Sequence, residues 1–208
     1  MQVFSNSSSS TLVGILAIKC FYPYLNKKNI HLSTCRRVAI GSFFWVLTYL
    51  SMAGVDHRIR RVYEETGEEI SIGWQFFPYF LAAFGFIFTV PPQDVLAFRV
   101  APSEWKVFGN AVYKFMQHGI GNFIARALVI RCAAWFTPDN GKDNINGIEN
   151  YTAAETWKFI YVLAAFPAFQ TFFCLLPWVD RWYQKVEEYI QAKEKEEEEM
   201  SRREAEDK

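Results

Sequence analysis

The chain is 208 residues long, 51% of its residues are hydrophobic, and its formal net charge is zero. This neutral balance gives no sign of nucleic-acid binding, and the sequence has no basic stretch interleaved with aromatic residues, so we expect no nucleic acid among its partners. Charged residues gather in short connecting segments and after residue 180, which leaves long apolar runs. This distribution predicts an all-α membrane protein, with a transmembrane region over residues 1–180 and a charged cytoplasmic tail, helical or disordered, over residues 181–208.

About five segments are candidates for transmembrane helices, each of which needs about 20 mainly apolar residues. In chain order they are residues 9–25, 38–54, 70–92, 107–136 and 157–178. The first contains Lys19, whereas the third is the clearest because it runs for 23 residues without a charge. Pro91 and Pro92 at the end of the third span predict a sharp stop there. Pro167 in the fifth span is of a kind that membrane helices tolerate.

The fourth span carries an unusual row of polar residues, which recur at every fourth position: Asn110, Lys114, His118, Asn122 and Arg126. On an α-helix this spacing forms a polar ridge. Each Lys or Arg near the bilayer centre costs about 2.5–3.5 kcal/mol, so the ridge should face other helices or a water-filled cavity. One interpretation is a polar pathway in which His118 titrates near neutral pH. The other interpretation is that the side chains of Lys114 and Arg126 extend to opposite membrane surfaces.

The connecting segments predict the orientation, because short loops rich in Lys and Arg face the cytoplasm. The first loop holds four Lys and Arg residues and no acid, the third loop contains Arg99 and Lys106, and the tail opens with Arg181 and Lys185. With five spans these three segments share one side, so we expect the N-terminus outside and the C-terminus in the cytoplasm, in the plasma membrane or an endomembrane. The two glycosylation acceptors, Asn6 and Asn150, then fall on the outer side.

Motifs that bind metals or carry catalysis are missing from the sequence. The four cysteines lack metal-ligand spacing, and there is no phosphate-binding glycine loop, nucleophile elbow or HExxH motif. We therefore expect no enzyme activity, no metal and no cofactor.

Several motifs resemble one family of transporters. The stretch ISIGWQFFPYFLAAFGFIF, followed by FRVAPSEWK, resembles the helix 10 to helix 11 region of proton-coupled oligopeptide transporters in the major facilitator superfamily. Upstream, YPYL with a basic pair and then CRRVAIG resembles the helix 8 to helix 9 connection, especially of fungal members. The resemblance implies a partial C-terminal half of a major facilitator fold, helices 8–12, with the orientation that the charges predict.

The same resemblance implies symport of protons with di- and tripeptides across the lipid bilayer. It gives four substrate-lining candidates: Tyr79, Phe86, Tyr113 and His118. Phe86 occupies the position of the family's helix 10 glutamate, which contributes to proton coupling, and Tyr113 occupies the position of a pocket-lining aromatic residue. Lys114 and His118 lie where the family is usually apolar or small.

Helices 1–7 of the family have no counterpart in this sequence, so we expect that the chain does not transport alone. It would need the missing N-terminal helices or a partner membrane subunit, because an alternating-access site lies between two halves. Met1 as a misplaced start is one form of this hypothesis. A second hypothesis, favoured by Phe86 and the charged fourth span, is a scaffold or accessory subunit derived from the family that does not transport. A third is an unrelated channel-like or receptor subunit.

Overall fold

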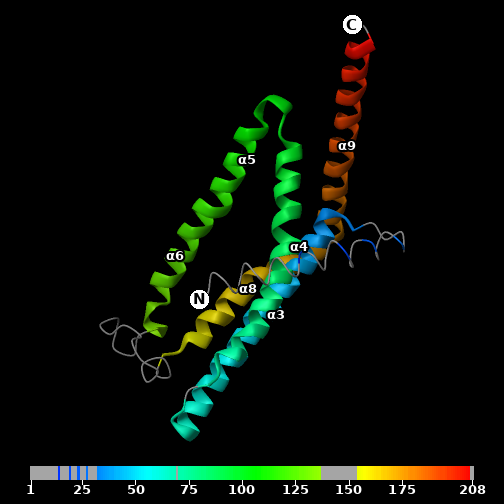
Figure 1. Cartoon of the computed structure of the whole chain (residues 1–208). Coiled ribbons are helices and arrows are strands. Elements are labelled where there is room, and N and C mark those ends of the chain that lie inside the picture. Colours follow the sequence, from blue (N-terminus) through cyan, green and yellow to red (C-terminus); the bar gives the residue numbers. More distant parts are fainter. Residues whose placement is uncertain are drawn as a thin grey trace.

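The computed structural model describes residues 32–68, 70–136 and 154–206, together with the single positions 14, 19, 23 and 27. Every regular element among these residues is a helix, as the all-α fold class predicts. Figure 1 shows a group of long helices that lie together, and one of them continues upward and turns back into a further helical stretch drawn in green. The expected span 9–25, apart from three single positions, and the sites Asn6 and Asn150 lie outside the described residues.

Helix α3, Thr34–Thr66, contains the expected span 38–54 and continues well beyond it. It begins at Ser33, whose hydroxyl oxygen accepts a hydrogen bond from the backbone N–H of Arg36, and it ends at Gly67 in the left-handed conformation (φ 69°). The residues after 54 are charged, but ion pairs four residues apart favour the helix there. Charge therefore marks the end of the apolar run and not the end of the helix.

Helix α4, Phe76–Val100, follows a 3₁₀ turn at Ile72–Gln75 and passes directly through Pro91 and Pro92. The sharp stop expected at this pair is wrong. Two interior prolines remove backbone donors and disfavour a helix. The continuation to Val100 is held by packing of α4 on α3 and α9 and by the pairing of Arg99 with Glu194.

The next helical segment consists of α5, Lys106–Lys114, a π-helical turn, Phe115–Ile120, and α6, Gly121–Arg131. Short 3₁₀ turns at Ser103–Trp105 and Ala133–Trp135 flank it. We call Lys106–Arg131 the arm. It covers most of the expected span 107–136 and measures about 39 Å at 1.5 Å per residue.

Helix α8, Thr156–Leu175, coincides with most of the expected span 157–178, and Pro167 lies inside it. An extended residue, Leu176, separates α8 from α9, Pro177–Glu206. The charged tail is therefore helical through Glu206.

Helix α3 packs against both α4 and α8 and so forms the centre of the bundle. Close approach of α3 to α4 depends on two glycines. A Cβ on Gly85 would lie 2.9 Å from the Trp45 ring, and one on Gly41 would lie 2.7 Å from the Thr89 methyl group. The Thr89 hydroxyl donates to the Gly85 carbonyl at 2.6 Å and accepts from the Trp45 indole at 3.4 Å. These glycines allow side chains of one helix to contact the backbone of the other.

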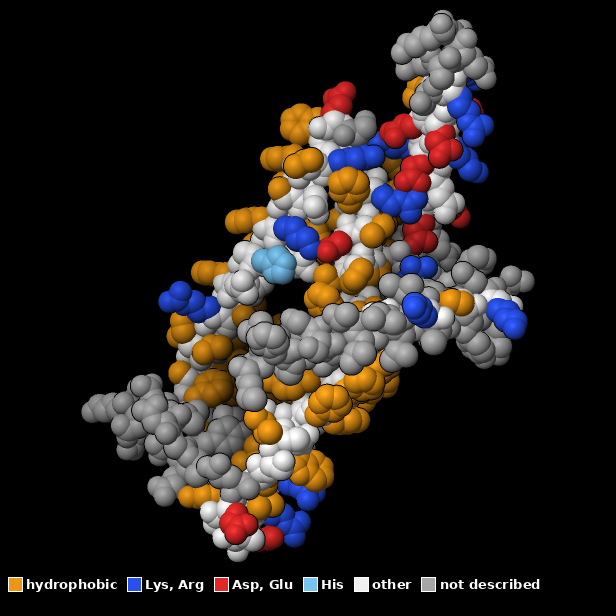
Figure 2. Space-filling model, in the orientation of Figure 1, with side chains coloured by type: hydrophobic (Ala, Val, Ile, Leu, Met, Phe, Trp, Pro, Cys, Tyr) orange, Lys and Arg blue, Asp and Glu red, His pale blue; other side chains and the backbone are white. Residues whose placement is uncertain are grey.

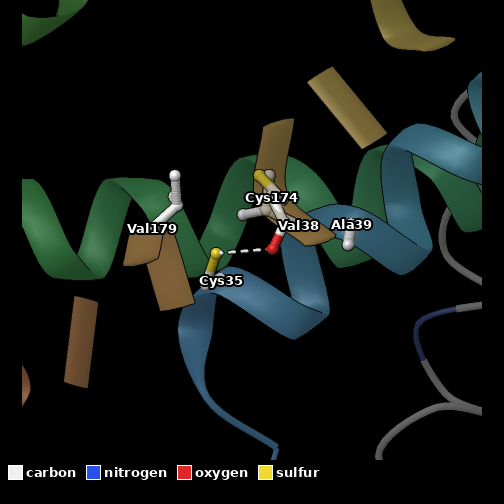
Figure 3. Packing of buried hydrophobic residues seen from close by; sticks show 5 residues of the cluster. All are labelled: Cys35, Val38, Ala39, Cys174 and Val179. Carbon is white, nitrogen blue, oxygen red and sulfur yellow. Dashed lines mark hydrogen bonds between the residues drawn. The ribbon is translucent and has the colours of Figure 1, made fainter. Parts of the chain in front are cut away.

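A small buried cluster joins the first turns of α3 to the junction of α8 and α9. Figure 3 shows Cys35, Val38 and Ala39 of α3 beside Cys174 and Val179. The Cys35 thiol donates a hydrogen bond to the Cys174 carbonyl at 3.3 Å. Both cysteines behave as small buried hydrophobic residues.

Three helical segments in the described part of the chain are long and apolar enough to cross a membrane: Thr34–Thr66, Ile72–Val100 and Thr156–Leu175. The arm is not among them, because the π turn divides its helix and it carries several cations. Figure 2 shows hydrophobic side chains along the arm and over the bundle, whereas acidic and basic side chains gather on α9 and the adjacent end of α4. The bundle surface is that of an integral membrane protein.

Candidate functional site

The four substrate-lining candidates lie on two different parts of the fold. Tyr79 lines a cavity of about 210 Å³ between α3, α4 and α8. The side chain of Phe86 is 44% exposed on another part of α4, and Tyr113 and His118 lie on the arm. Tyr113 is half-buried, whereas His118 is exposed. The described structure therefore does not bring all four around one cavity.

The polar ridge passes through the π turn. Asn110 and Lys114 lie in α5 and are half-buried, His118 lies in the π turn, and Asn122 and Arg126 lie exposed in α6. In an α-helix, a row of residues spaced four apart winds slowly around the helix axis, because one turn holds only 3.6 residues. A π turn holds more than four residues and so winds the row back in the opposite direction. The π turn therefore keeps the polar ridge closer to one face of the arm than an unbroken α-helix would.

The half-buried end of the ridge forms an acid–base pair with α4. The Lys114 ammonium lies 2.6 Å from the Asp94 carboxylate, and it also donates to the Gln117 side chain at 3.4 Å. The same ammonium lies 5.6 Å from the centre of the Tyr113 ring. We call Asp94, Tyr113, Lys114 and Gln117 the α4–α5 polar joint. Sequence reasoning assigned Asp94 to a loop, because it follows the proline pair, and so missed this partner of Lys114.

A second charged group is buried between α3 and α8. The Asp56 side chain is almost fully buried and pairs with Arg60 at 2.9 Å. The Thr156 hydroxyl donates to the other Asp56 oxygen at 2.8 Å and accepts from the Arg60 guanidinium at 2.8 Å. Every polar group in this triad has a partner, as buried ionic groups require. The four-residue spacing of Asp56 and Arg60 could have indicated this ion pair from the sequence. Thr156 could not have been identified in this way, because it is 100 positions away from Asp56.

The tail helix α9 docks on the ends of α3 and α4 through acids spaced seven residues apart. Asp180 accepts from Ser33 at 2.7 Å and pairs with Arg36 at 3.1 Å. Glu187 accepts from the backbone N–H of Thr34 at 2.8 Å, and Glu194 accepts from the Arg99 Nε at 2.8 Å. Partly buried Tyr183 and buried Ile190 lie between these acids on the same face. We call Asp180, Tyr183, Glu187, Ile190 and Glu194 the α9 seam.

The sequence did not predict the α9 seam. A search for apolar residues at seam positions fails, because three of the five residues are acidic. The seven-residue spacing of the acids, read together with the basic residues of the first and third expected loops, was the available signal.

With this geometry in place, comparison with known families gives a decisive result. A model of the POT family (PTR2) matches residues 2–145, which is more than half of the chain. The chain belongs to the POT family. A search of the curated proteins found no match. POT-family proteins are peptide transporters, so the three membrane-length helices are those of an integral membrane protein of a peptide-transport family.

The POT-family assignment gives meaning to several residues of the fold. Gly41 and Gly85, which fit the family pattern, are positions at which a Cβ would overlap the facing helix of the α3–α4 pair. Phe86 stands where the resemblance places a glutamate, and it carries no ionisable group. The matched residues contain α3 to α6, whereas α8 and α9 follow the matched region.

Proposed function

We propose that this POT-family chain supplies helices of the C-terminal half of a proton-coupled transporter of di- and tripeptides. It acts together with the family's remaining helices, carried either by the same polypeptide or by a partner membrane subunit. The observation that carries the proposal is the family match across α3 to α6, joined to membrane-length apolar helices.

The exposed arm supports the need for further helices. Large apolar side chains on several sides of it are exposed, among them Phe108, Phe115, Met116, Phe123 and Ile130. Within the described residues, α6 packs mainly against its neighbours in the chain. Its ridge nevertheless carries His118, Asn122 and Arg126, which lipid does not accommodate. Both properties fit an arm that packs against a second set of helices with the ridge turned toward a polar path.

The α4–α5 polar joint is the proposed proton-coupling group. Phe86 cannot bind a proton, whereas Asp94 lies eight residues further along α4 and its carboxylate pairs with Lys114. A proton on Asp94 would remove its charge and release the lysine. Tyr113, which lies beside this pair, is a proposed peptide contact. Tyr79 and His118, which lie further away, are two more.

The arrangement of basic residues supports a cytoplasmic C-terminus. Arg36 at the start of α3 pairs with Asp180, and Arg99 near the end of α4 pairs with Glu194, so both helix ends lie beside α9. Arg36 and Arg99, from two of the expected basic loops, therefore lie at the same end of the bundle as α9. That end is the proposed cytoplasmic side.

A scaffold or accessory subunit without transport is the second candidate function. Phe86 favours it, because the ionisable group expected at that position is missing. The long solvent-facing part of α9 also favours it, since a charged helix that extends beyond the bundle offers a surface to other proteins.

Uptake of a labelled dipeptide separates these candidates. Proteoliposomes with the chain alone should show no uptake above empty liposomes. Co-reconstitution with the N-terminal helices of a POT-family transporter should give uptake that an inward proton gradient drives and a protonophore abolishes. Asp94→Asn should then remove the proton dependence, whereas Glu104→Gln, an exposed acid near the same helix end, should not. Dipeptide uptake by the chain alone, or none with the added helices, would contradict the proposal.

A further inference from the structure

A cavity of about 690 Å³ lies between the second half of α3 and the start of α4, away from the α4–α5 polar joint. Its lining includes Ser51, Val55, Arg58 and Arg61 of α3, with Trp74 and Phe77 on the opposite side. The α3 residues recur at intervals of three or four and so form one face of the helix. Along this face the lining changes from small and apolar residues to a charged end with two arginines and Glu65, the partner of Arg61.

The position of the cavity is that of a membrane interface. The uncharged run of α3 ends at Val55, and the arginines follow within the next two turns. On the α4 side, Trp74 precedes the apolar helix by two residues, and tryptophan favours the depth of the headgroups. The apolar end of the cavity therefore faces hydrocarbon and the cationic end faces headgroups.

Arg58 is the side chain best prepared to bind an anion. Its guanidinium carbon lies 4.0 Å from the centre of the Trp74 ring, a cation–π contact that holds the group at the cavity. This contact does not use the N–H donors as hydrogen bonds, and a guanidinium fork matches two oxygens of a phosphate. Among the described residues no carboxylate forms an ion pair with Arg58, whereas Arg61 pairs with Glu65 at 2.8 Å.

We propose that this cavity binds one anionic phospholipid, with its phosphate on Arg58 and an acyl chain along Val55 and Phe77. Charge complementarity and the gradation from apolar to cationic lining select this occupant. A soluble anion would leave the apolar lining unused, and a neutral lipid would leave Arg58 unpaired. The proposal is independent of peptide transport, because it requires only the α3–α4 hairpin in a membrane.

Native mass spectrometry of the purified full chain tests the proposal. Phosphatidylglycerol and phosphatidylcholine with identical acyl chains are titrated in separate arms, and inorganic phosphate in a third. We expect one phosphatidylglycerol to be retained, and Arg58→Gln to weaken its retention about tenfold, as expected for one lost charge-assisted contact. Arg58→Lys should weaken it less. Arg202→Gln, which removes an exposed cation of α9, should leave it unchanged.

Three results would overturn the proposal. Equal retention of the two lipids would show that charge does not select the occupant. Unchanged retention in Arg58→Gln would show that the phosphate lies elsewhere. Displacement of the lipid by inorganic phosphate at millimolar concentration would show a site for the free ion. Thermal unfolding of each variant verifies that the comparison is between folded proteins.

Discussion

At the scale of the residue, the buried triad of Asp56, Arg60 and Thr156 shows how charge is accommodated between apolar helices. Both charged side chains are nearly enclosed, at 1% exposure for Asp56 and 13% for Arg60. Desolvation of such a pair is costly, and the attraction offsets it only while all partners are present. The triad therefore fixes the relative position of α3 and α8 more than it adds net stability.

Removal of one partner should be costly. Asp56→Asn leaves Arg60 charged in a buried position, and we expect a loss of about 3–5 kcal/mol, the range for a broken buried pair. The double variant Asp56→Leu with Arg60→Met should recover much of this loss. Thermal unfolding in detergent, followed by size-exclusion chromatography, measures both. A single variant as stable as the unmodified chain would contradict the buried pair.

His118 gives a second prediction at this scale. If the ridge lines a polar path in the assembled protein, His118→Cys should react with a membrane-impermeant thiol reagent in native membranes. Phe123→Cys, on an exposed apolar position of the same arm, should react slowly because the thiol lies in lipid. The unmodified chain gives the background of its own cysteines. Complete protection of the cysteine at position 118 would exclude a water-accessible path there.

At the scale of the element, the contact between α3 and α4 depends on two residues that have no side chain. Space at Gly41 and Gly85 is already filled by the facing helix, so any Cβ forces the helices apart. Gly54, on the same helix as Gly41, has nothing within 4 Å of its Cβ position. Gly85 and Gly54 thus offer a matched comparison between a crowded glycine and an open one.

Gly85→Ala should destabilise the hairpin by about 1–3 kcal/mol, the usual cost of overpacking, because its Cβ would overlap the Trp45 ring. Gly54→Ala should be neutral or slightly stabilising, since alanine favours a helix over glycine. Thermal unfolding of the two variants in the same detergent gives the comparison. Equal melting temperatures would show that α3 and α4 do not approach as closely as described.

Helix α9 provides a charge-dependent contact between elements. Hydrogen bonds from Arg99 lower the pKa of the Glu194 carboxyl below its ordinary value. A lowered pKa in the docked state means that docking is favoured above the ordinary glutamate pKa and loses this contribution as the pH falls through the lowered value. Around pH 7 the contribution is fully present.

Charge reversal tests this docking. Arg99→Glu should loosen the end of α9 and speed chymotryptic cleavage after the exposed residues Trp182 and Tyr189 at pH 8. The swap of Arg99→Glu with Glu194→Arg should restore slow cleavage. Arg203→Glu, near the end of α9, serves as the control and should not change cleavage at these sites. Equal cleavage in all variants would contradict docking through the α9 seam.

At the scale of the whole molecule, the packed part and the exposed part have different roles. Helices α3, α4 and α8 bury small residues against one another, whereas the arm exposes large apolar side chains together with its polar ridge. The outer surface of the three-helix bundle and the exposed surface of the arm then remain for contact with lipid and with further helices. This division is the physical basis for the proposal that the chain works with a second set of transporter helices.

The sequence alone determined the membrane class, the apolar parts of α3, α4 and α8 among its five expected spans, and the resemblance to the POT family. Runs of about 20 apolar residues and the family motifs are local signals. The tertiary structure decided how far the helices extend: α3 and α4 continue beyond their apolar runs. It also decided that Thr156 joins the Asp56–Arg60 pair, and it decided the partners of Asp94 and of the α9 seam. Those contacts join residues 20 to 153 positions apart, and no local pattern specifies which distant side chain fills a given space.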